Sequence, residues 1–131
     1  MRIEATGSLV IGDYCYVGDD TLISVNTSVT IGNDVAIAHG VQIFDNTSHP
    51  IDWRERQDHT RGILTGTGSG ARFPGRPVSI GDNVWLGTNS LIRAGVSIGA
   101  RSIVSAMAMV TEDVPSDVIV AGNPATVVKR L

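Results

Sequence analysis

Aliphatic residues recur at every sixth position through most of the chain, and this period constrains the fold more than any other feature. The positions that carry it are Ile11, Val17, Ile23 and Val29, then, after a two-residue slip, Ile31, Ile37 and Ile43, and after a longer break Ile80, Leu86, Ile92, Ile98, Val104 and Val110. A period of six does not keep one face of a helix with about 3.6 residues per turn, so an amphipathic helix is excluded.

The residues between these anchors predict how the chain turns. The position four residues after an anchor is mostly small or β-branched, as at Val35, Ser90 and Ala108, and turn-tolerant pairs such as Gly32-Asn33 and Gly81-Asp82 follow the anchors. Each hexad therefore supplies a short strand and a corner, and three hexads raise the chain by about 4.8 Å, one strand spacing. The pattern predicts a three-sided coil of stacked parallel strands, and the low aromatic content of 5% fits a core of Ile and Val.

The repeat lapses over about residues 45–77, where we expect a long excursion loop. A loop of this length inside a compact coil is more often functional than idle. Its glycine-rich run, residues 65–70, resembles a phosphate-binding loop only superficially, because the Walker lysine and the following helix are missing, and we interpret it as a flexible tether. Beyond the last hexad, Val118 to Ala121 predict one more strand, and residues 122–131 predict a short cap over the end of the coil.

Length and composition limit the classes of protein to consider. The 131 residues suit one domain, residues 1–131, and a net charge of −3 leaves no basic footprint for nucleic acid. The single cysteine forms no internal disulfide, and the start of the sequence lacks the apolar segment of a signal peptide or a membrane span. We therefore expect a cytoplasmic protein with no nucleic-acid partner and no membrane span.

The histidines are the candidates for a general base, because a neutral imidazole is well matched to taking a proton near pH 7. The chain has His39, His49 and His59. Of these, His49 stands in Thr47-Ser48-His49-Pro50, where the chain leaves the coil, so the sequence favours it. A solvated loop histidine without a catalytic role is the alternative.

The hexads resemble those of the hexapeptide-repeat family, whose coils wind left-handed, although periodicity alone also admits a right-handed coil. His49-Pro50 before a loop and the closing segment at residues 80–87, Ile-Gly-Asp-Asn-Val-Trp-Leu-Gly, resemble galactoside, maltose and chloramphenicol-type O-acetyltransferases. The long loop is closer to the acetyltransferases that decorate polysaccharides. The resemblance implies an all-β fold, a single-stranded left-handed parallel β-helix.

The same resemblance implies an acetyl-CoA-dependent O-acetyltransferase that needs no metal. Its acceptor would be a hydroxyl of a sugar or polysaccharide precursor, which attacks the thioester directly with His49 as general base. Tyr16 and Trp85 match positions near the acceptor. The positions that match CoA contacts are Thr88, Ala106, Thr111, Lys129 and Arg130. The resemblance also implies a homotrimer with its sites between subunits.

Three departures from the family pattern leave the acceptor open and weaken the CoA assignment. Gly18 replaces an expected asparagine, Ser105-Ala106-Met107 replaces Gly-Ala-Gly, and Glu112 replaces a lysine. A non-catalytic scaffold or CoA-binding module is therefore an alternative, as is N-acetylation of an amino sugar. Neither the sequence nor the resemblance shows whether Asp45, Glu55 or another carboxylate orients His49.

A γ-type carbonic anhydrase is a further alternative, since it uses the same coil and binds zinc through three histidines. The histidine pair that it needs, five residues apart, is missing, because ten residues separate His39 from His49 and His49 from His59. Cys15 occupies a small, inward-facing position, so we expect it to pack instead of acting as a nucleophile.

Overall fold

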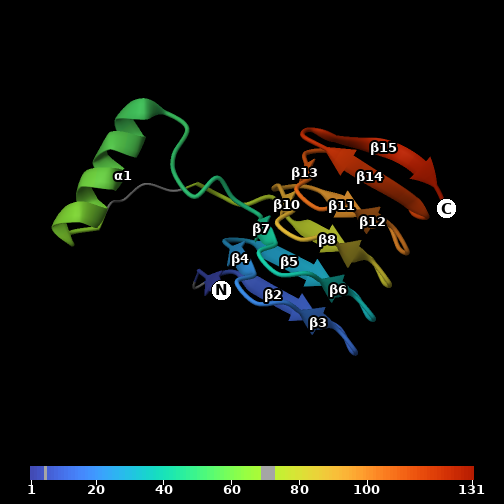
Figure 1. The fold of residues 1–131 in the computed structure, drawn as a ribbon. Helices are drawn as coiled ribbons and strands as arrows, with labels where there is room; N and C mark the ends of the chain where they lie inside the picture. Colours follow the sequence, from blue (N-terminus) through green and yellow to red (C-terminus); the bar gives the residue numbers. More distant parts are fainter. Residues whose placement is uncertain (5, 69–72) are drawn as a thin grey trace.

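The computed structural model describes residues 1–4, 6–68 and 73–131, which form a coil with three sides (Figure 1). The first side, sheet A, holds β1 (Arg2–Ile3), β4 (Leu22–Val25), β7 (Gln42–Phe44), β10 (Leu91–Ile92) and β13 (Met109–Val110). Sheet B holds β2 (Ser8–Ile11), β5 (Ser28–Ile31), β8 (Val78–Ile80) and β11 (Ser97–Ile98). Sheet C holds β3 (Tyr16–Val17), β6 (Ala36–Ile37), β9 (Trp85–Leu86), β12 (Ile103–Val104), β14 (Val118–Gly122) and β15 (Ala125–Arg130).

The chain visits sheets A, B and C in turn, so each coil stacks its strands in parallel on those of the coil before. Ile43 of β7, for example, lies in register between Ile23 and Ile92. The predicted arrangement of stacked parallel strands is therefore confirmed.

The aliphatic anchors build the core. From Ile23 onward every anchor is buried, and the largest fully buried side chains include Ile37, Leu86 and Ile92. Ile11 and Val17 are exceptions at 37% and 43% exposed, because β2 and β3 are the end strands of their sheets, with a neighbour on one side only. The anchors are therefore exposed only in the first described coil, whereas Val110 on the end strand β13 is still buried.

The corners use left-handed backbone conformations with the same six-residue period. Residues 83, 89, 95, 101 and 107 all have positive φ, from 55° to 82°. Asn83, Asn89 and Gly95 tolerate this conformation, whereas Arg101 and Met107 pay a steric cost of about 1–2 kcal/mol each. Stacking on the coils above and below therefore imposes the corner geometry even where the residue does not favour it.

The excursion contains a helix, so the all-β expectation is wrong for this segment. Helix α1 spans Trp53–Thr65 and stands away from the coil (Figure 1). The carboxylate of Asp52 caps its first turn by accepting from the N–H groups of Arg54 and Glu55, at 2.9 and 3.1 Å, and Gly66 ends it in a left-handed conformation. Caps at both ends turn a charged run that lacks an obvious apolar stripe into a helix.

The glycine-rich run is only partly described. Thr65 is the last helical residue and Gly66 the cap, whereas Ser69 and Gly70 of the expected tether lie outside the described residues. No helix in the described part of the chain is long and apolar enough to cross a membrane.

The C-terminal segment forms an antiparallel hairpin at the end of the coil. β15 pairs with β14, with Ile119 opposite Lys129, and it is the edge strand of sheet C. The residues expected to form a cap thus extend sheet C as its outermost strand.

Candidate functional site

The excursion leaves the coil beside a buried carboxylate. Asp45 follows β7 directly and is fully buried. Its Oδ1 accepts from the backbone N–H of Asn26 at 2.8 Å, and its Oδ2 accepts from the N–H of Thr27 at 2.7 Å. The structure places the two extra residues of the slip at Asn26 and Thr27, between the end of β4 and the start of β5, and both N–H groups come from them. These bonds offset the cost of burying the carboxyl group.

The returning end of the excursion is fixed to the same place. The carbonyl of Phe73 accepts from Nδ2 of Asn26 at 3.1 Å, and the N–H of Arg76 donates to the carbonyl of Asp45 at 2.6 Å. Gly75 passes so close that a Cβ there would lie 2.8 Å from the carbonyl oxygen of Asp45. Only glycine fits at this position without movement of the backbone. The two ends of the excursion are therefore held together at the slip.

Asn46 links this hydrogen-bond network to the backbone beside His49. Its Nδ2 donates to the carbonyl of Ser24 at 3.2 Å, and its Oδ1 accepts from the N–H of Ser48 at 2.8 Å. The Thr47 hydroxyl donates to the carbonyl of His49 at 2.7 Å. The His49 side chain is exposed, but these bonds fix the backbone that presents it.

The His49 ring lies against His59 of α1, and His59 in turn lies against Phe73 of the returning segment. The ring centroids of His49 and His59 are 5.1 Å apart and those of His59 and Phe73 are 5.2 Å apart, both pairs edge to face. Within the described residues no carboxylate hydrogen-bonds the His49 ring. Neither Asp45 nor Glu55 hydrogen-bonds the ring, and in the described part of the chain the side-chain bonds of Asp45 reach only Asn26, Thr27 and Asn46.

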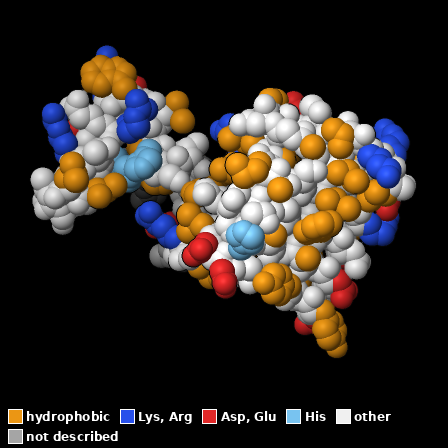
Figure 2. Space-filling view, viewed as in Figure 1, with side chains coloured by type: hydrophobic (Ala, Val, Ile, Leu, Met, Phe, Trp, Pro, Cys, Tyr) orange, Lys and Arg blue, Asp and Glu red, His pale blue; other side chains and the backbone are white. Residues whose placement is uncertain are grey.

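The predicted acceptor and CoA residues lie mostly on sheet C. The register of the strands places Tyr16, Trp85 and Lys129 in one row across this sheet. Thr88 and Ala106 follow β9 and β12 at the adjoining corner, where the N–H of Met107 donates to the carbonyl of Thr88 at 2.9 Å. Basic side chains also gather at this C-terminal end of the coil in Figure 2.

Two of the predicted residues fall elsewhere. Arg130 lies on β15 opposite Val118, one residue beyond Lys129. Thr111 follows β13, on sheet A, and so is not part of the sheet C wall. The segment that carries His49 leaves the coil at the corner between sheets A and B, whereas Tyr16 and Trp85 belong to sheet C. Within one chain, the candidate base and the candidate CoA-binding residues of sheet C therefore lie on different sides of the coil.

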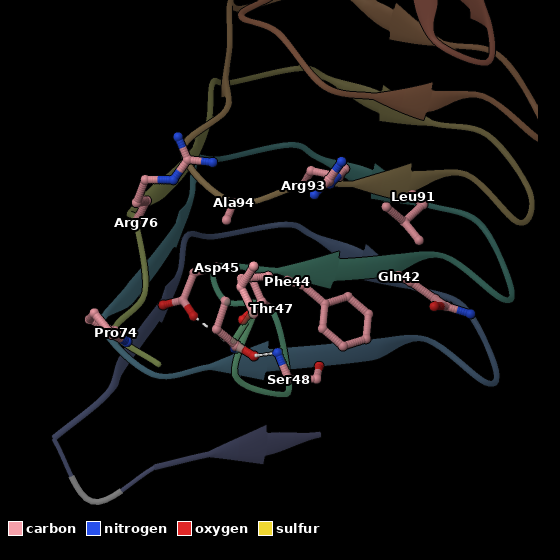
Figure 3. A pocket seen from close by; sticks show the side chains of 12 residues that line it. Gln42, Phe44, Asp45, Thr47, Ser48, Pro74, Arg76, Leu91, Arg93 and Ala94 are labelled. Atoms are coloured by element: carbon pink, nitrogen blue, oxygen red, sulfur yellow. Dashed lines mark hydrogen bonds between the residues drawn. The ribbon is translucent and has the colours of Figure 1, made fainter. Parts of the chain in front are cut away.

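A pocket of about 380 Å³ lies beside the base of the excursion, on the outer face of sheet A (Figure 3). Its lining is Gln42, Phe44, Asp45, Asn46, Thr47, Ser48, Ile51, Pro74, Arg76, Leu91, Arg93 and Ala94. Sequence reasoning missed Arg76 and Arg93. Only their positions in the sequence could have indicated a role in the pocket, since Arg93 follows the anchor Ile92 and Arg76 lies at the end of the excursion.

The described residues offer no group of three His, Cys, Asp or Glu side chains arranged to hold a metal ion. His39 lies at a corner of the coil, and only His49 and His59 come together. The half-buried Cys15 packs against the core and its thiol lies 3.1 Å from the carbonyl of Gly32, as expected for a structural residue.

Comparison with known proteins agrees with this architecture. Residues 77–112 match the model of the bacterial transferase hexapeptide (six repeats). The galactoside O-acetyltransferase of Escherichia coli K12 is 34% identical over 121 residues, which are 92% of this chain and 53% of that protein.

Solved structures extend the likeness to the fold. A hexapeptide-repeat acetyltransferase from Vibrio cholerae O1 biovar eltor, complexed with acetyl coenzyme A, superposes with a TM-score of 0.81 at 32% identity, covering 99% of this chain and 64% of that one. A galactoside acetyltransferase in complex with coenzyme A gives 0.78 at 32% identity, covering 93% and 55%. The chain thus spans between half and two thirds of the length of these relatives, and they imply left-handed winding for its coil. Residues 77–112 belong to the hexapeptide-repeat family, and along nearly its whole length the chain resembles the acetyltransferases of that family.

Proposed function

We propose that residues 1–131 act as one domain that transfers an acetyl group from acetyl-CoA to a hydroxyl of a sugar-like acceptor. The observation that carries this proposal is the placement of His49. It is an exposed imidazole on a backbone fixed by the buried Asp45 and Asn46 network, at the point where the excursion leaves a hexapeptide coil. The galactoside relatives support the class of acceptor.

In this mechanism His49 takes the proton from the acceptor hydroxyl as its oxygen attacks the thioester carbonyl of acetyl-CoA. A bond forms between the acceptor oxygen and the carbonyl carbon, and the tetrahedral oxyanion is stabilised by N–H donors. Collapse of the intermediate breaks the bond from carbon to sulfur, and His49 returns the proton to the departing CoA thiolate. The products are the acetyl ester and free CoA, and no metal is needed.

The row on sheet C suits the long, anionic CoA molecule. Trp85 and the corner residues Thr88 and Ala106 would flank its arm, and Lys129 would face its phosphates, whereas Arg130, on the opposite face of β15, would have to reach them from the strand's end. Thr111, on sheet A, would need CoA to extend around the coil, so we give it no role in this wall.

The separation of base and wall favours a second copy of the chain at each site. We propose a homotrimer in which His49 of one subunit faces the sheet C wall of its neighbour. A symmetric arrangement would give each subunit one complete site. The lone cysteine favours the cytoplasm as the compartment.

A thiol-release assay with acetyl-CoA and a panel of sugars and amino sugars tests the proposal. We expect acceptor-dependent release, and His49→Ala should lower it by about a hundredfold or more, as for loss of a general base. His39→Ala is the matched histidine variant and should retain activity. If His39→Ala is inactive and His49→Ala is not, the base has been assigned to the wrong histidine. Amino sugars separate N-acetylation from O-acetylation.

A non-catalytic CoA-binding module is the second candidate, and Met107 is the observation that favours it. This residue is 70% exposed with a φ of 65°, at the corner beside Thr88 and Ala106, where the family pattern has glycine. The thioether could obstruct an active site that opens at this corner. Tight CoA binding without acceptor-dependent release would support this candidate over the enzyme.

A further inference from the structure

We propose that the pocket beside the excursion binds an anionic group of the acceptor, so that the substrate is a hydroxylated sugar that also bears a carboxylate or a phosphate. This inference rests on the proposed function and deepens it. The pocket is lined by Thr47 and Ser48, which directly precede His49, and it lies on sheet A, whereas the predicted acceptor and CoA residues lie mostly on sheet C.

The floor of the pocket is apolar. In sheet A, Gln42 is in register with Leu91, and Ile43 with Ile92, so the next residues, Phe44 and Arg93, are also neighbours. Ile43 and Ile92 are fully buried, so the residues on either side of them face outward. Phe44 and Leu91 therefore form a surface on which the apolar face of a sugar ring can lie, and Ile51 and Pro74 also line the pocket.

Two guanidinium groups stand along one side of this floor. Figure 3 shows Arg76 and Arg93 on the same side of the pocket, with Ala94 between them. Neither forms an ion pair with a described residue. Arg76 is held in place from two directions, since its N–H donates to Asp45 and its carbonyl accepts from the N–H of Gly95 at 3.1 Å. Its guanidinium also lies over Gly95, where a Cβ would come within 3.3 Å of Cζ.

The one acid in the lining, Asp45, does not form an ion pair with either arginine. Asp45 is fully buried, and both of its oxygens accept from N–H groups of Asn26 and Thr27. Asp45 keeps its negative charge but forms no ion pair with either arginine, so the lining carries a net positive charge and offers two guanidinium groups to a ligand that enters from solvent. Arginine pairs of this kind favour carboxylates and phosphates, because the planar group can donate two parallel bonds.

The opposite side of the pocket provides hydroxyl and amide groups close to the candidate base. Thr47 and Ser48 line it and precede His49 directly, and Gln42 lies at the end of the floor. An apolar floor with a few converging polar groups is the usual form of a small-molecule site, and the volume is at the lower end of the usual range of about 300–1,000 Å³. A sugar held here by its anionic group would lie beside Thr47 and Ser48, the two residues that precede His49.

Three probes that share one ring and differ at C6 test this inference: glucose, glucuronate and glucose 6-phosphate. Binding is measured by titration calorimetry on the full chain without acetyl-CoA. We expect at least one charged sugar to bind about tenfold or more tighter than glucose, and Arg76→Gln and Arg93→Gln each to remove most of that advantage, the usual effect of losing a charge-assisted hydrogen bond. The two charged probes distinguish a carboxylate from a phosphate. Arg61→Gln, an exposed arginine on α1 outside the pocket, is the matched control and should bind like the wild type.

Other outcomes overturn the inference. Equal binding of all three sugars, no binding of either charged sugar, or a preference that survives both substitutions would show that the pocket does not select an anion. If CoA displaces the charged sugar, and the substitutions raise the KM for acetyl-CoA instead of that for the acceptor, the cations serve the CoA phosphates. His49→Ala should bind the charged sugar normally. Normal binding without acetyl transfer to any acceptor would refute the proposed function and leave the pocket assignment standing.

Discussion

The coil and the excursion of this protein are held together by different forces. The coil buries an aliphatic side chain in every hexad from Ile23 onward, whereas Gly62 is the only buried residue of α1 and Leu64 is 80% exposed. What holds the excursion is polar: the bonds of Asp45, Asn46 and Asn26 at its two ends. The stability of the coil is therefore spread over many equivalent apolar contacts, whereas the position of the candidate base depends on a few hydrogen bonds where the excursion joins the coil.

Removal of one core side chain tests the coil and should have the largest effect. Ile92 is fully buried between Ile43 and Val110, so Ile92→Ala should lower the free energy of unfolding by about 2–5 kcal/mol through lost burial and a cavity. Leu64→Ala on α1 is the control and should change it by less than about 0.5 kcal/mol. Urea denaturation measures both. Similar losses for the two variants would mean that α1 packs against something as firmly as the core does.

Removal of the buried carboxylate tests the excursion. Asp45→Ala leaves the N–H groups of Asn26 and Thr27 without their acceptor, which should cost about 1–3 kcal/mol of stability. Because the backbone at His49 loses its support, kcat for acetyl transfer should fall by about ten- to a hundredfold with little change in the KM for acetyl-CoA. Limited proteolysis should cut the variant within residues 45–77 before it cuts the coil. Asp58→Ala, an exposed acid on α1, serves as the control, and an unchanged kcat in Asp45→Ala would disprove the positioning role.

Relief of corner strain tests whether stacking imposes the geometry of the coil. Met107→Gly should raise the free energy of unfolding by about 1 kcal/mol, because glycine adopts the left-handed conformation without steric cost. Asn89→Gly at the equivalent corner should change little, since asparagine already tolerates that conformation. Thermal unfolding measures both variants. A loss of stability in Met107→Gly would mean that its side chain makes contacts worth more than the strain.

The smallest expected effect concerns an exposed ion pair at a corner of the coil. The side-chain hydrogen bond from Arg101 lowers the pKa of Asp117 below its ordinary value of 3.8; desolvation opposes this shift, and the positive charge of Arg101 adds to it. A lowered pKa in the folded state means that the pair stabilises the fold fully above the unfolded pKa. That contribution disappears as the pH falls below 3.8 through the folded pKa.

The measurement is the urea midpoint against pH for the wild type and Asp117→Asn. We expect a small difference between the two urea midpoints at neutral pH, and this difference should disappear in acid. Asp20→Asn is the control, because Asp20 has a similar corner conformation and no ion pair with any described residue. A difference that grows in acid would contradict the sign of the pKa change.

The sequence predicted the coil because each hexad repeats the same pattern, one aliphatic anchor followed by a turn. The anchors at Ile31, Ile80 and Ile98 lie in register on sheet B, and contacts between neighbouring coils follow from the period alone. The histidine at the exit of the coil was also visible, since His49 stands where the period stops. Its role as a base remains a proposal.

The contents of the excursion could not be predicted in the same way. Helix α1 has no clear apolar stripe, and it forms because Asp52 and Gly66 cap it, so the charged run was interpreted as a loop. The bond between Asn26 and Phe73 joins residues 47 positions apart, outside any repeat. A contact of this kind leaves no periodic pattern in the sequence, so it could not be predicted from the repeat.

The sequence by itself determined the three-sided coil, its aliphatic core and the place of its interruption, because a six-residue period brings the aliphatic anchors to the inside of a stacked coil, although it does not fix the hand of that coil. Only the tertiary structure decided which distant residues meet: Asp45 with the slip at Asn26 and Thr27, His49 with His59, and Arg76 with Arg93 around one pocket. The physical reason is that burial of a repeated apolar side chain is a local and additive effect. A polar site, by contrast, depends on the exact meeting of single groups that the folded chain brings together.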